Sequence, residues 1–255
     1  TIEMKYSQVG PEFTSLANPY LSSNLREFVF SDRFRVFDNK LAIGYEYKNR
    51  NNKILRTVVD PYKQKTSTMT FAFAPGAGMA SFSASFQNVT RTNEKTSLDT
   101  LVYTSYTGKD SIAFRDKREN TLTGNRFLSV SVPVRRNGSS YNLLMTYNSI
   151  DVEDMLEKER DSDYVQKAAN SEAISLITSA KFASPLQATV TLSKYTVQIP
   201  MAGVDPADSE SRLTTIGANG SYGLWGARAK LSAGLSLLNA TGMSKFTFIG
   251  LNGGA

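Results

Sequence analysis

The stretch "ARAKLSAGLSLL", residues 227 to 238, alternates apolar with polar or small side chains without a break. Leu231 and Leu235 share one parity, whereas Lys230 and Ser232 share the other. Because successive side chains of a strand point to opposite faces, the stretch predicts a strand that separates two environments. The apolar face meets a packed core in a soluble protein, and it meets lipid in a transmembrane barrel.

The same period of two recurs along the chain and predicts about ten strands from roughly residue 39 onward. Each predicted strand is near the ~9 to 11 residues that a tilted membrane strand requires. Asn137-Gly138 supplies two residues that tolerate positive φ, and therefore predicts a type I′ hairpin turn.

The predicted connections alternate in length. Tight connections are expected at residues 75–78, 136–139, 184–186 and 224–226. Long polar connections are expected at about 49–65, 91–121, 151–171 and 199–211. Short turns at one end and long loops at the other are typical of an up-and-down outer-membrane barrel.

The composition excludes several classes of protein. No apolar run approaches the ~20 residues of a spanning helix, so a membrane crossing would have to use strands. The chain has no histidine and no cysteine, which removes the Ser-His-Asp and Cys-His arrangements and the zinc-thiolate sites. We therefore expect no enzymatic role and no cofactor. The acidic run at 151–163 lacks the spacing of an EF-hand, so no metal site is expected. The net charge of +6 is spread along the chain and does not indicate a nucleic-acid partner.

The polar parity indicates which face is wet. It carries mostly Ser, Thr, Gly, Ala and Asn, which suit the inside of a closed barrel better than the open surface of a soluble sheet, where charged residues prevail. The apolar parity is bulkier, with aromatic residues toward strand ends, as expected at a lipid interface. These aromatic residues are Tyr47, Tyr141, Tyr147, Phe182 and Tyr222.

Two sets of site residues follow from this assignment. The residues expected to face lipid are Leu41, Ile43, Phe71, Phe73, Leu128, Val130, Leu143, Leu231 and Leu235. The charged residues expected to face the lumen are Glu46, Lys48, Lys181, Arg228 and Lys230. Charged rings of this kind tune ion selectivity in pores. The alternative is that they are solvated or paired at strand ends and select nothing.

The chain resembles an outer-membrane β-barrel protein over roughly residues 26–251. The lead-in is similar to the region before the carboxy-terminal barrel of large, poorly characterised outer-membrane proteins. Three motifs carry this resemblance: Gly10-Pro11-Glu12-Phe13, Asn18-Pro19-Tyr20-Leu21 and Arg26-Glu27-Phe28. The resemblance implies a location in a Gram-negative outer membrane and assembly by its insertion machinery. Such barrels usually end in an aromatic residue, whereas this chain ends in "LNGGA", so we expect a barrel that could be incomplete.

The sequence thus predicts an all-β, antiparallel up-and-down transmembrane β-barrel of about ten or more strands, with short periplasmic turns and long external loops. A lead-in segment is expected at 1–25 and the barrel at 26–255. The leading functional hypothesis is a membrane-embedded scaffold or anchor for surface or periplasmic assemblies. A porin-like channel for small hydrophilic solutes and a soluble β-rich adhesin or surface-layer subunit are the alternatives. The expected partners are outer-membrane lipid, the insertion machinery and other subunits or domains.

Overall fold

The structure is a computed structural model of the 255-residue chain. It describes residues 1–10, 25–52, 62–93, 99–104, 110–115, 118–156, 169–198, 209–224, 229–242 and 245–254. In the two short strands within 99–115, only the backbone is described.

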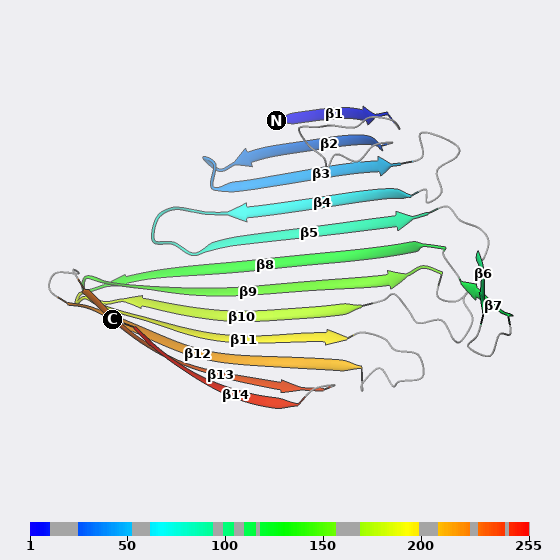
Figure 1. The fold of residues 1–255 in the computed structure, drawn as a ribbon. Coiled ribbons are helices and arrows are strands. Elements are labelled where there is room, and N and C mark those ends of the chain that lie inside the picture. The colour runs from blue at the N-terminus through cyan, green and yellow to red at the C-terminus, as the bar shows by residue number, and fades with distance from the viewer. Residues whose placement is uncertain are drawn as a thin grey trace.

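One antiparallel sheet of twelve strands dominates the described structure (Figure 1). Its strands are β1 (Ile2–Val9), β2 (Leu25–Val36), β3 (Leu41–Asn51), β4 (Lys63–Phe73), β5 (Ser81–Thr92), β8 (Asn120–Arg136), β9 (Ser139–Asp154), β10 (Asn170–Lys181), β11 (Leu186–Gln198), β12 (Glu210–Leu224), β13 (Ala229–Thr241) and β14 (Phe246–Gly254). A separate hairpin consists of β6 (Asp99–Thr104) and β7 (Asp110–Arg115).

Within the large sheet, each strand pairs with its neighbours in chain order, so the topology is up-and-down. The connections β2–β3, β4–β5, β8–β9, β10–β11 and β12–β13 are short and lie at one end of the sheet, here called the turn end. The longer connections lie at the opposite, loop end, where β13–β14 is the one short connection (Figure 1). The prediction of an all-β, antiparallel up-and-down fold of ten or more strands is confirmed. No helix in the described ranges is long and apolar enough to cross a bilayer.

The sheet extends further toward the N-terminus than the strands predicted from the sequence. β1 lies within the segment expected to be a lead-in, and it pairs with β2 from Ile2–Asp32 to Val9–Leu25. The alternation along β2 is irregular, because Asp32 interrupts the row of apolar side chains on one of its faces. The hairpin β6–β7 lies within the long connection expected at about 91–121.

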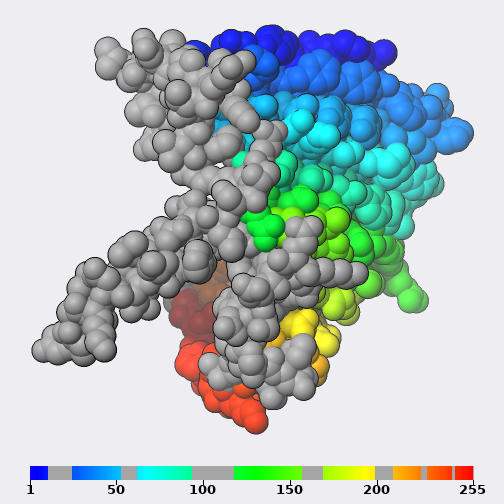
Figure 2. All heavy atoms as spheres, turned by 90° about the vertical axis from the view of Figure 1, so that its right-hand side faces the viewer, coloured from blue at the N-terminus to red at the C-terminus, as the bar shows by residue number. Residues whose placement is uncertain are grey.

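The sheet is curved, and its two faces differ in shape. In Figure 2 the strands follow an arc from β1 at the top to β13 at the bottom. Two open hollows lie on one face. The first is lined mainly by side chains of β1–β3, and the second mainly by side chains of β11–β14. We call this face, which carries Glu46 and Ser193, the concave face, and the opposite one, which carries Tyr45 and Leu192, the convex face.

The β8–β9 turn has the backbone conformation that its sequence predicts. Asn137 and Gly138 have φ of 51° and 75°, both in the left-handed region that a type I′ turn requires. Glycine occupies that region without the steric clash that a Cβ causes, and asparagine tolerates it.

Gly138→Val is therefore expected to destabilise the fold by about 1–2 kcal/mol, because valine is strained at positive φ. Gly138→Asn is the matched control and should remain close to the parent. Urea unfolding midpoints of the refolded protein, followed by circular dichroism, provide the measurement. Equal midpoints for the two variants would contradict the assigned turn.

Candidate functional site

The central feature of the convex face is an unbroken row of apolar side chains that crosses eleven strands. Each member is the direct cross-strand partner of the next, from β2 to β14. The row consists of Val36, Leu41, Phe73, Phe82, Val130, Met145, Leu176, Leu192, Ile216, Leu237 and Ile249. Directly opposed side chains lie close enough to pack against each other, so the row forms one continuous apolar surface.

This surface is open rather than covered by another layer of the described structure. Met145 is 50% exposed, Leu192 and Ile216 are each 45% exposed, and Ile249 is 65% exposed. Ala84 is buried, because its cross-strand partners Phe71 and Leu128 are much larger than it is. The convex face therefore presents packed side chains whose outer surfaces remain available for contact.

The apolar surface is wider than one row, and it is oblique to the strands. The next row toward the loop end is apolar from Phe34 to Ile174, but at β11 it reaches Lys194. The next row toward the turn end is largely apolar from Val132 on β8 to Leu251 on β14. We call these three rows the belt. Its drift is the geometry expected when strands are tilted relative to a flat apolar layer.

Aromatic side chains lie along both margins of the belt. Tyr141 and Phe182 are in edge-to-face contact at the turn end, with ring centroids 6.1 Å apart. Tyr222 lies on the same side of the belt, opposite Leu186 and Leu231. Tyr47 and Tyr147 lie on the loop side. An apolar band between two aromatic margins is the pattern that strands show at membrane interfaces.

Beyond the belt, the loop end of the convex face is charged. Arg126 lies 3.8 Å from Asp151 on the neighbouring strand. At the start of β12, a hydrogen bond from Arg212 holds the pKa of the Glu210 carboxyl below its usual value. The convex face thus changes from apolar to charged along the strands toward the loop end.

The concave face is built mainly from small polar side chains that bond to one another across strands. The hydroxyls of Thr146 and Ser175 are 2.7 Å apart, and Ser131 donates to Asn142 at 2.9 Å. Such contacts satisfy hydroxyl and amide groups within the layer of side chains, as a wet or protein-filled lumen requires.

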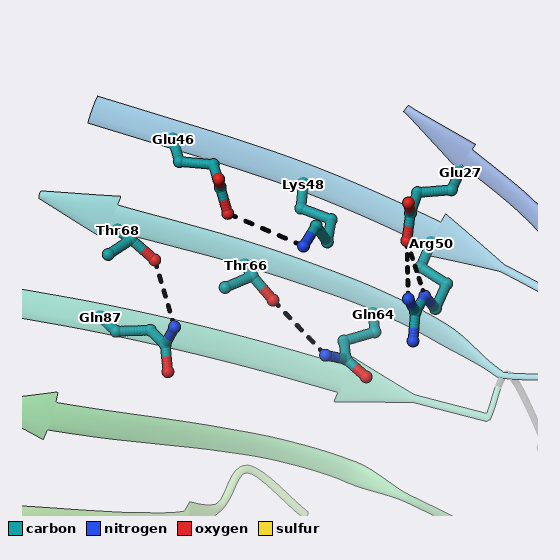
Figure 3. A network of polar contacts seen from close by, with 8 residues as sticks. All are labelled: Glu27, Glu46, Lys48, Arg50, Gln64, Thr66, Thr68 and Gln87. Carbon is teal, nitrogen blue, oxygen red and sulfur yellow. Dashed lines mark hydrogen bonds and ion pairs between the residues drawn. The ribbon is translucent and has the colours of Figure 1, made fainter. Parts of the chain in front are cut away.

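Charged residues of the concave face form pairs toward the loop end, and Figure 3 shows those on β2 and β3. Arg50 donates from Nε and Nη2 to one carboxylate oxygen of Glu27, at 2.9 and 2.7 Å. Lys48 lies 3.7 Å from Glu46 on the same strand. Arg91 lies 3.3 Å from Glu119 and stacks over the ring of Tyr62, 5.3 Å from its centroid.

The register places the residues expected to face the lumen in two groups, and it does not bring them into one site. Glu46 and Lys48 lie on the concave face and pair with each other. Lys181 and Lys230 also lie on that face, at the turn end. Arg228 lies outside the described residues.

The nine residues expected to face lipid all lie on the convex face. Phe73, Val130, Leu143, Leu231 and Leu235 are exposed there, whereas Leu41, Ile43, Phe71 and Leu128 are half-buried among their neighbours. Their contact with lipid stays a prediction.

Sequence reasoning missed an aromatic patch on the concave face. Tyr195, Phe246 and Phe248 lie there and are 44%, 52% and 60% exposed, and Phe127 lies further along the same face. The signal was weak because β14 is apolar on both parities, so alternation could not assign its faces. Within the described ranges, no group of three or more Asp or Glu side chains could hold a metal ion.

No protein-family model and no curated protein matches the chain. Among solved structures, the chain is similar to LpxR from Salmonella typhimurium, with a TM-score of 0.29 and 8% sequence identity. The alignment covers 89% of this chain and 86% of that one. A likeness at this level identifies neither a family nor an activity.

Proposed function

We propose that this protein is a membrane-embedded β-barrel, or a segment of one, that acts as a scaffold or anchor in an outer membrane. In this arrangement the belt contacts lipid acyl chains, and the concave face forms the lumen. The observation that carries the proposal is the continuous and largely exposed apolar row across eleven strands of the convex face.

The extent of the exposed surface argues against the soluble alternative. Soluble monomers rarely expose contiguous apolar patches larger than a few hundred Å². Here nine of the eleven apolar side chains in the row from Val36 to Ile249 are exposed, and Leu41 and Leu237 are half-buried. In water, a surface of that kind would promote association of the chains. In a bilayer, the same surface contacts lipid acyl chains and is kept out of water.

The strand arrangement also suits a bilayer. Every backbone polar group within lipid needs a partner, so only helices and closed barrels span membranes. Pairing in the sheet is continuous from β1 to β14, which leaves one edge on each of these two strands. Because the number of strands is even, β1 and β14 run in opposite directions, as neighbouring strands of an up-and-down barrel do.

The concave aromatic patch favours a scaffold over an open pore. Tyr195, Phe246 and Phe248 present exposed rings on the face that would line the lumen. Packing these rings against protein lowers the free energy, because it removes apolar surface from water. A water-filled channel would leave the rings exposed and without this stabilisation. A lumen filled by a loop, a plug or another domain would cover these rings.

A charge placed on the belt tests the membrane proposal. Leu192→Arg is expected to destabilise the protein folded in phospholipid vesicles by about 2–4 kcal/mol, because it places a guanidinium in hydrocarbon. The matched control is Ser193→Arg, at the neighbouring position of β11 on the concave face, where the guanidinium stays in a polar environment. Urea titrations of vesicle-folded protein measure both variants.

Two results would contradict the membrane proposal. One is equal destabilisation by the two substitutions. The other is a parent chain that folds fully in buffer without detergent or lipid.

Electrical recording separates the scaffold from the pore. Protein reconstituted into a planar bilayer is expected to give no unit conductance steps, because the aromatic patch is covered by protein in the lumen. Protease resistance and heat-dependent migration on a gel verify insertion in the same preparation. Reproducible steps from inserted protein would refute the scaffold proposal and favour a channel for small solutes.

A further inference from the structure

The carboxylates of β8–β14 are confined to one end of these strands. The carboxylates described on these strands all lie toward the loop end: Asp151, Glu153, Asp154, Glu172 and Glu210. At the turn end, the concave face carries Arg135, Lys181 and Lys230, and no described carboxylate lies on that part of either face. This half of the sheet therefore has a basic turn end.

Arg135, Lys181 and Lys230 are exposed, and none of them forms an ion pair with another described residue. Arg135 and Lys181 are both cross-strand partners of Ser140, so they flank one strand at the same height. Lys48, Arg50 and Arg91, at the loop end of β3–β5, differ because a carboxylate accompanies each of them. On the concave face of β8–β14, every described cation thus lies at the turn end and has no carboxylate partner.

A hollow of about 380 Å³ lies between β11 and β14, next to Lys230, whereas Arg135 lies further away on β8. Lys230 lines it together with hydroxyl and amide groups from Gln187, Asn219, Ser221, Ser232 and Asn252. Gln187 is the cross-strand partner of Lys181, so a second ammonium lies next to the hollow. Its lining combines hydrogen-bond donors with cationic charge and contains no carboxylate, which suits an anion.

We propose that this turn-end hollow binds small anionic solutes that carry phosphate or carboxylate groups, drawn in by Arg135, Lys181 and Lys230. Lysine and arginine are the side chains that recognise these groups, and low-dielectric walls around a cleft focus its potential and raise the local concentration of counter-ions. The inference rests on the proposed function only in requiring that the turn end of the concave face be open to water.

The absence of cysteine allows a direct test, because a single introduced thiol labels one site. Ser140→Cys places a thiol-linked dye between Arg135 and Lys181, and Ser171→Cys places the same dye at the loop end of the concave face. Quenching by iodide, divided by quenching by neutral acrylamide, reports the enrichment of anions at each dye. The measurement uses protein folded in zwitterionic detergent at low salt.

We expect the ratio at position 140 to exceed that at position 171 by about two-fold or more, because clustered charges create potentials of at least kT. Lys181→Gln with Lys230→Gln should reduce the difference by about half or more, because Arg135 alone then remains charged. The control pair Lys48→Gln and Lys65→Gln removes the same charge elsewhere and should preserve it. Inorganic phosphate should lower iodide quenching at 140 more than chloride does at equal ionic strength.

Equal ratios at the two positions would overturn the proposal, as would a difference that stays unchanged after Lys181 and Lys230 are neutralised. A dye at 140 that acrylamide cannot quench would also overturn it, because solutes would not reach the turn end of the concave face. Failure of the membrane proposal is seen separately, as a chain that folds in buffer alone, in which the same ratios can be measured.

Discussion

The structure depends on the backbone hydrogen bonds that join each strand to the next in chain order. These bonds fix the register, and a register shift of one residue would move every side chain of a strand to the other face. In the observed register, Val36 on β2 is connected through successive partners to Ile249 on β14 without meeting a polar residue. The belt is therefore a property of the whole ladder and of no single strand.

The belt runs obliquely across the rows of directly paired residues. This oblique course links the fold to the proposed function. Near β2 the apolar residues extend toward the loop end, whereas near β13 they extend toward the turn end. A flat apolar environment that meets tilted strands selects such a diagonal distribution. The same tilt places charged pairs such as Arg126 and Asp151 beyond the belt on one side, while Lys230 remains at the opposite end.

Much of this could be predicted from alternation, because period two assigns Leu231 and Lys230 to opposite faces without any knowledge of partners. Positive φ at Asn137 and Gly138 followed from local turn chemistry. β1 was missed although Ile2, Met4 and Tyr6 alternate with polar residues, because the run is short and its place in the sheet depends on pairing with β2. The faces of Phe246 and Phe248 and the hollow beside Lys230 could not be predicted, because they arise from register and curvature across several strands.

The central claim, that the belt contacts lipid, is tested most directly by spin labels placed one at a time along β11, from Gln187 to Val197, in protein folded into vesicles. The account predicts that accessibility to oxygen, which concentrates in hydrocarbon, peaks at Val190 and Leu192. Accessibility to a water-soluble nickel chelate should instead be higher at Thr191 and Ser193. Low accessibility to both reagents at Val190 and Leu192, as in a packed protein core, would contradict the account.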